Sequence, residues 1–181
     1  MDRRIPILSL VGYTNAGKST LLNALTKSHI ETGNILFETL DTTTRRLKFP
    51  REREVILSDT VGFIQSLPAD LLGAFRSTLD ELRDACLLIH VVDISNPRFV
   101  QQMATVEQTL GDLSLSETPV LRVFNKSDKV PMEMAATLCA RYDAVAVCAH
   151  DLNSLAPLLL AIETRLWDME RVPAAPLAQA L

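Results

Sequence analysis

Nine consecutive residues, Gly12–Thr20 with the sequence GYTNAGKST, combine the residue types that bind a phosphate group. They follow an apolar run, Ile5–Val11, and lead into an amphipathic segment. This order predicts a strand, a glycine-rich loop and a helix, which is the arrangement of a P-loop. The pattern G-x-x-x-x-G-K-[ST] is met by Gly12, Gly17, Lys18 and Ser19.

Each position of this loop has a chemical task. The glycines let successive backbone N–H groups face inward as an anion nest, and the following helix directs its positive end to the same place. Lys18 is expected to reach the β- and γ-phosphates and to be catalytic, and the Ser19 hydroxyl to bind Mg²⁺. The alternative is a glycine-rich turn without a ligand. The predicted phosphate-binding residues are Gly12, Asn15, Ala16, Gly17, Lys18, Ser19 and Thr20.

A second motif, D-x-x-G, is formed by Asp59 and Gly62 after another apolar strand. Asp59 can hold Mg²⁺ through water from the side opposite Ser19. Gly62 offers a backbone N–H that can approach the γ-phosphate closely, so it is a second predicted catalytic position. A strand that simply ends in a turn is the alternative.

A third motif, NKSD, spans Asn125–Asp128 at the end of a further strand. Ligands of open α/β sheets bind beyond the carboxyl ends of the strands. The Asp128 carboxylate can accept two hydrogen bonds from guanine N1–H and N2–H₂, donors that adenine lacks, which would select GTP over ATP. Asn125 would bridge to the P-loop, and the stem of Lys126 would cover the base. A capped helix start is the alternative.

The alternation of strand-like and helix-like segments predicts a three-layer α/β fold with a mostly parallel sheet and one antiparallel edge strand. Residues 27–44 read as a long polar connection, and residues 172–181 as a linker or frayed tail. The predicted strands are 5–11, 45–49, 54–58, 86–92, 119–124 and 144–148, and the helices begin near residues 18, 71, 97, 132 and 155.

Composition limits the function classes. The 181 residues are enough for one domain, and the net charge of -4 argues against a free-standing nucleic-acid binder, so no DNA binding is expected. No apolar stretch approaches the ~18 residues that cross a membrane. The three cysteines, Cys86, Cys139 and Cys148, fit no metal spacing and are interpreted as reduced, mostly buried thiols of a cytoplasmic protein.

The segments GYTNAGKST, LFETLDTTTR, DTVGFI and HVVDISNP resemble the G domain of the HflX family, in the Obg–HflX group of Ras-like GTPases. The resemblance implies a G domain over residues 1–171, Mg²⁺ with GTP and GDP, and a switch that acts on the large ribosomal subunit. It also implies excision from a larger protein with an N-terminal domain. The isolated domain is expected to be a monomer.

The resemblance also implies further site residues. Thr43 aligns with the switch threonine that binds the metal and the γ-phosphate, and it is the third predicted catalytic position; Thr44 is the competing candidate. Cys148 and Ala149 take the place of the last guanine-binding motif, where the Ala149 N–H would meet guanine O6. The predicted metal ligands are therefore Ser19, Thr43 and Asp59.

Two positions bear on the rate of hydrolysis. Phe63 replaces the glutamine that orients water in Ras-like proteins, so slow intrinsic hydrolysis and a need for a partner are expected. Asn15 is the candidate for holding K⁺ at the phosphates, against the alternative of a hydrogen bond that shapes the turn. A nucleotide-gated binding module and an ATP-dependent kinase remain as alternatives, and NKSD argues against the kinase.

Overall fold

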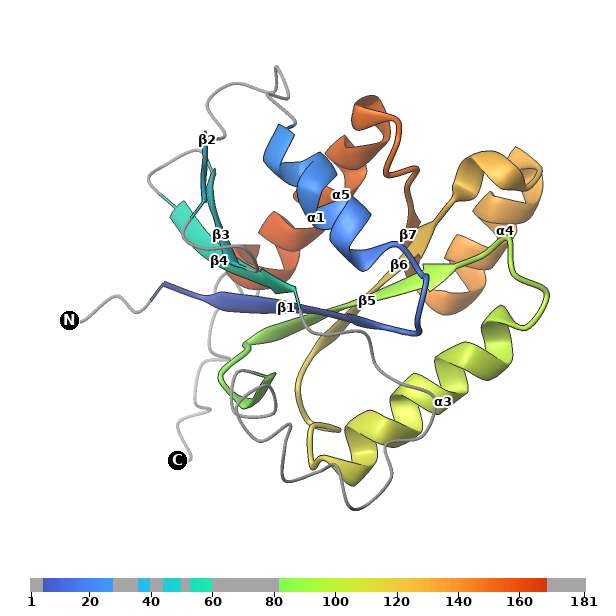
Figure 1. The fold of residues 1–181 in the computed structure, drawn as a ribbon, viewed down its shortest axis with the longest axis horizontal. Coiled ribbons are helices and arrows are strands. Elements are labelled where there is room, and N and C mark those ends of the chain that lie inside the picture. The colour runs from blue at the N-terminus through green and yellow to red at the C-terminus, as the bar shows by residue number, and fades with distance from the viewer. Residues whose placement is uncertain (1–4, 28–35, 40–43, 50–52, 60–81, 169–181) are drawn as a thin grey trace, which may run out of the picture.

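A computed structural model describes residues 5–27, 36–39, 44–49, 53–59 and 82–168 (Figure 1). Within these ranges a seven-stranded sheet has the order β2-β3-β4-β1-β5-β6-β7. The central strands β1 and β5 are parallel neighbours, as the βαβ alternation predicts. The strands are β1 (Ile7–Gly12), β2 (Leu36–Thr39), β3 (Thr44–Phe49), β4 (Arg53–Asp59), β5 (Leu87–Asp93), β6 (Val120–Asn125) and β7 (Ala144–Ala146).

The predicted antiparallel strand is confirmed, but it does not lie at the edge of the sheet. β3 pairs antiparallel with both β2 and β4, and the other pairs are parallel. β2 lies outside β3 and was part of the predicted connection 27–44. A four-residue strand in a polar stretch carries little periodicity, so its pairing partner rather than its own pattern defines it.

Four described helices cover the two faces of the sheet and confirm the three layers. α1 (Lys18–Lys27) and α5 (Ala156–Glu163) share a core on one face, whereas α3 (Phe99–Asp112) and α4 (Met132–Tyr142) share one on the other (Figure 1). α5 ends at Glu163, where a π-helical segment, Thr164–Asp168, continues from it.

The sheet interior explains the apolar run of β5. All residues from Leu87 to Val92 are buried, because helices cover both faces of this strand. His90 is 1% exposed and is therefore a core histidine. Burial lowers its pKa to about 4. Trp167 covers the edge of the core, where its ring packs against Phe49.

The cysteine prediction is wrong in part. Only Cys148 is buried; Cys139 is half-buried and Cys86 is exposed. Cys86 directly precedes β5, where the chain enters the sheet from the surface, so an apolar neighbourhood in sequence does not bury it.

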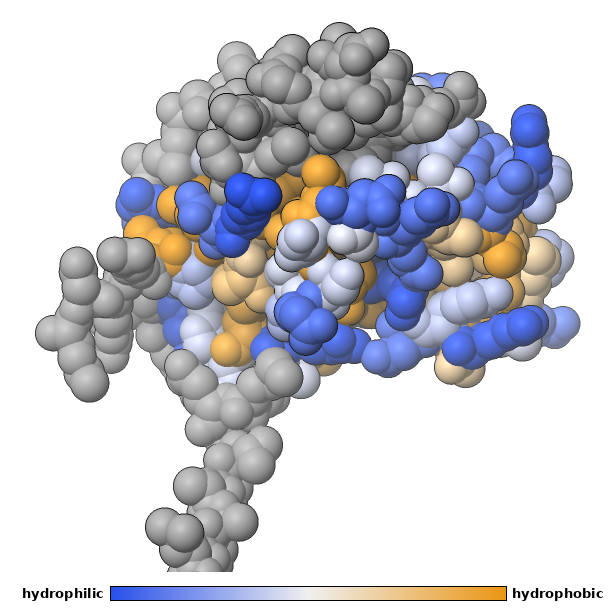
Figure 2. All heavy atoms as spheres, turned by 90° about the horizontal axis from the view of Figure 1, so that it is seen from below, coloured by the Kyte–Doolittle hydropathy of each residue, from blue (hydrophilic) through white to orange (hydrophobic). Residues whose placement is uncertain are grey.

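The described surface shows no broad apolar face in the view of Figure 2. Hydrophobic side chains occur there in several patches between hydrophilic ones. Among the described residues, no helix is long and apolar enough to cross a membrane.

Candidate functional site

The loop between β1 and α1 is shaped by two glycines that have no room for a side chain. A Cβ at Gly12 would lie 2.4 Å from the Val91 carbonyl oxygen. Gly17 has φ +96°, and a Cβ there would lie 2.3 Å from Asn125 Nδ2. The loop therefore packs directly on the ends of β5 and β6, which only glycine permits.

Lys18 begins α1 and turns its side chain back along the loop. Its Nζ donates hydrogen bonds to the carbonyl oxygens of Gly12 and Tyr13, each at 3.1 Å. Burial lowers its pKa, and the nearby Asp59 carboxylate opposes that shift. The first turn of α1 leaves the N–H groups of Lys18, Ser19 and Thr20 without intrahelical acceptors. A buried ammonium and these N–H groups form a site suited to an anion.

Ser19 and Asp59 meet although they lie on different elements. Ser19 Oγ on α1 donates to Asp59 Oδ2 at the end of β4, over 2.6 Å. The other carboxylate oxygen, Asp59 Oδ1, is buried and has no hydrogen-bond partner among the described residues. A hydroxyl beside an incompletely paired carboxylate is the oxygen donor set that Mg²⁺ prefers, so these residues fit the predicted metal.

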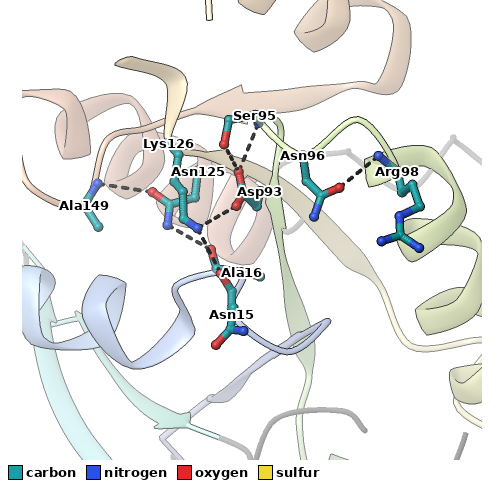
Figure 3. A network of polar contacts seen from close by, with 9 residues as sticks. All are labelled: Asn15, Ala16, Asp93, Ser95, Asn96, Arg98, Asn125, Lys126 and Ala149. Atoms are coloured by element: carbon teal, nitrogen blue, oxygen red, sulfur yellow. Dashed lines mark hydrogen bonds and ion pairs between the residues drawn. The ribbon is translucent and has the colours of Figure 1, made fainter. Parts of the chain in front are cut away.

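Asn125 joins three segments of the site (Figure 3). Its Nδ2 donates to the Ala16 carbonyl oxygen at 3.0 Å, and its Oδ1 accepts from the Ala149 N–H at 3.2 Å. The side chain is 2% exposed. The predicted bridge from NKSD to the P-loop is present, and the same amide also holds the loop after β7.

Lys126 points toward the P-loop, and Asp128 points to solvent. Lys126 Nζ donates to the Asn15 carbonyl oxygen at 3.0 Å and to Asp93 Oδ2 at 2.5 Å (Figure 3). Asp128 lies in the 3-10 turn Ser127–Lys129 and is exposed. Among the described residues no group bonds its carboxylate, so both oxygens can accept from a ligand.

Asn15 contributes its backbone rather than a side-chain hydrogen bond. Its φ of +63° is left-handed, its side chain is exposed, and within the described ranges no hydrogen bond of its carboxamide occurs. A hydrogen bond that shapes the turn, the alternative role for Asn15, is therefore not made by its side chain within the described ranges, and both roles stay predictions.

The loop after β7 is braced by a residue that the sequence reading missed. Ser154 Oγ accepts from the Cys148 N–H at 2.8 Å and lies within hydrogen-bonding distance of the Cys148 and Asp151 carbonyl oxygens. Ser154 lies in the 3-10 segment Leu152–Leu155, six positions beyond Cys148. It holds the loop that contains Cys148 and Ala149.

Asp93 is the second residue that was missed, although its strand was quoted for the family resemblance. Its signal is a carboxylate at the carboxyl end of a buried strand, the same feature that singled out Asp59. Thr43, Gly62 and Phe63 lie outside the described residues, as do residues 172–181, and these predictions stay untested.

The first comparison with known proteins concerns the family. The family model described as "50S ribosome-binding GTPase" matches residues 7–126. This range contains the P-loop, D-x-x-G and the first part of NKSD.

The second comparison concerns curated proteins that are similar in sequence, and it indicates the same family. GTPase HflX of Caldanaerobacter subterraneus subsp. tengcongensis is 54% identical over 169 residues, which are 93% of this chain and 39% of that protein. GTPase HflX of Alkalihalophilus pseudofirmus is 46% identical over 162 residues, 90% of this chain and 38% of that protein. The resemblance stated from the motifs is thereby confirmed, and this chain spans less than half the length of these relatives.

A solved structure shows the same fold. The GTP-binding protein of the archaeon Sulfolobus solfataricus in complex with GDP has a TM-score of 0.67 and 27% identity, and the match covers 90% of this chain and 53% of that one. The P-loop GTPase fold class is therefore confirmed.

Proposed function

Because this chain belongs to the family of 50S ribosome-binding GTPases, we propose that it is the G domain of a GTP-hydrolysing switch that acts on the large ribosomal subunit. The observation that supports this most is the convergence on Asn125 of the P-loop and the loop after β7. That amide brings a phosphate-binding loop and a base-binding loop into one site.

The roles of the residues follow from their positions. Lys18 and the N-terminus of α1 bind the β- and γ-phosphates. Asp128 accepts from guanine N1–H and N2–H₂, and the Ala149 N–H donates to guanine O6. The residues proposed to bind GTP are those of the P-loop together with Asn125, Lys126, Asp128, Cys148 and Ala149.

Mg²⁺ would be held by Ser19 and, through water, by Asp59, with Thr43 as the proposed third ligand. When bound, the ion neutralises charge on the phosphates. The residues of this chain would do the rest: Lys18 orients the phosphates, and the backbone N–H of Gly62 approaches the γ-phosphate.

Hydrolysis by the domain alone is proposed to be slow, since Phe63 has no group that could orient water. The test compares GTP turnover with and without 50S subunits. The proposal expects a clear acceleration by the subunits. Equal turnover in both mixtures contradicts it, and negligible turnover in both favours a nucleotide-gated binding module.

Asn15 is proposed to hold K⁺ at the phosphates. Its left-handed backbone leaves the carboxamide exposed beside the loop, where it can reach a ligand. Faster turnover in KCl than in NaCl is expected, and identical rates in both salts refute this role.

A further inference from the structure

We propose that Asp93 is a positioning residue for guanine binding, which acts by holding Lys126 over the base site and against the P-loop. The proposal rests on the proposed function, because it takes the base to lie at the NKSD loop. Asp93 ends β5, and Lys126 follows the neighbouring strand β6, so both side chains lie at the same edge of the sheet (Figure 3).

The two oxygens of Asp93 have separate partners. Oδ1 accepts from the backbone N–H of Ser95 at 3.0 Å and from the Ser95 hydroxyl at 2.5 Å, which forms a local turn. Oδ2 is not needed for that turn, and it accepts from Lys126 Nζ. A purely local role would leave Oδ2 to solvent, whereas here it meets an ammonium group from another strand.

The charge state of Asp93 suits this contact. Partial burial alone would raise its pKa, but hydrogen bonds from Lys126 and Ser95 and the charge of Lys126 outweigh burial and lower the pKa. The carboxylate is therefore ionised at neutral pH, and the contact is a charge-assisted hydrogen bond between side chains that are 14% and 27% exposed.

Lys126 is held in a backbone conformation that needs support. Its φ is +60°, in the left-handed region that lysine rarely adopts. The residue it contacts in the P-loop, Asn15, is also left-handed, with φ +63°. The Lys126 ammonium group donates to the Asn15 backbone and so links these two left-handed residues. Such backbone conformations persist where surrounding contacts stabilise them. Of the described groups that bond the Lys126 ammonium group, the Asp93 carboxylate is the charged one.

These two contacts hold the Lys126 side chain in one conformation. With Nζ held by Asp93 at one side and by the Asn15 carbonyl oxygen at the other, the methylene groups span the gap between the P-loop and NKSD. A stem that is already ordered covers the base without further loss of side-chain entropy on binding. Asp93 would thus favour binding of every purine nucleotide alike, while Asp128 selects guanine.

The test measures dissociation of fluorescent GDP from the full chain and its Asp93→Asn variant. Asparagine has no charge and one acceptor oxygen in place of two, so it cannot accept from both Ser95 and Lys126. The weakened contact with Lys126 predicts dissociation that is about 10-fold faster. Since the contact acts on bound substrate and transition state equally, KM for GTP should rise by a similar factor with kcat unchanged. Ser95→Ala keeps the backbone bond to Asp93 and should give a smaller change in the same direction.

A double-variant cycle separates positioning from a structural role. Lys126→Met keeps the stem and removes the ammonium, so adding Asp93→Asn to it should not speed dissociation further. The matched control is Asp143→Asn, which removes a carboxylate that accepts from Arg165 at 2.6 Å. Asp143 directly precedes β7, so it lies at the amino ends of the parallel strands, opposite the candidate site. It should leave dissociation unchanged.

The outcomes are distinct. If the unmodified chain does not bind GDP, the proposed function fails. If it binds GDP but Asp93→Asn dissociates at the original rate, or if the effects of Asp93→Asn and Lys126→Met multiply, the positioning role is overturned and the proposed function stands.

Discussion

At the scale of single residues, buried polar side chains that hydrogen-bond the backbone of the P-loop define the site. Asn125 and Lys18 are both buried and polar, and both are bonded to backbone carbonyl oxygens of the P-loop. Polar groups are costly to bury without partners, so these contacts fix the loop in one conformation.

Asn125→Ala tests this directly. It removes both bonds of the amide and leaves the Ala16 carbonyl oxygen and the Ala149 N–H without that partner. We expect about 2 kcal/mol lower stability by denaturant unfolding and at least ~10-fold weaker GDP binding by titration. Asn153→Ala, at an exposed position, is the control and should change neither. Unaltered GDP affinity in Asn125→Ala would contradict the bridging role.

At the scale of elements, the close approach of the P-loop to β5 and β6 depends on glycine. Gly17→Ala places a Cβ 2.3 Å from Asn125 Nδ2 at a φ of +96°. We expect a destabilisation of about 1–3 kcal/mol, measured as a lower denaturation midpoint.

Gly111 of α3, unlike Gly17, has room for a side chain. An added Cβ there lies 3.7 Å from its nearest neighbour, Ser116 Oγ, at a helical position. Gly111→Ala should therefore stabilise by up to ~1 kcal/mol. Equal effects of the two substitutions would show that the P-loop tolerates a side chain at Gly17.

The stability of the fold should depend on pH through His90 of β5. The ordinary pKa of 6.5 falls to about 4 in the folded chain, mainly by burial, with Glu107 opposing and Arg122 and Lys18 adding to the shift. Between pH 6.5 and 4 the unfolded chain binds a proton on this imidazole that the folded chain does not. Stability should therefore fall as pH drops through this range, by about 3 kcal/mol.

His90→Leu provides the comparison. The variant lacks the imidazole, so its loss of stability between pH 6.5 and 4 should be smaller than that of the unmodified chain by that amount. Unfolding free energies measured across this range check it. Parallel profiles for the two chains would show that His90 does not titrate as its burial requires.

The elements also show what sequence could and could not predict. The P-loop, β5 and α3 were predicted because long apolar patterns and glycine spacing are local signals. β2 was missed because its four residues lie in a polar stretch and carry no clear period. Asp93 and Ser154 were missed as site residues because their partners lie 33 and six positions away, which spacing alone does not reveal.

At the scale of the molecule, the site lies along one edge of the sheet. The carboxyl ends of β1, β4, β5 and β6 bring Gly12, Asp59, Asp93 and Asn125 together, while the helices on both faces make the core. This is the crevice in which open α/β sheets bind ligands.

Competition for fluorescent GDP bound to the chain is the most direct test of a guanine-nucleotide site in this domain. If Asp128 reads guanine and the P-loop binds its phosphates, unlabelled GTP displaces the probe, and ATP at the same concentration leaves it bound. Displacement by ATP as readily as by GTP would contradict a guanine-nucleotide site built from these residues.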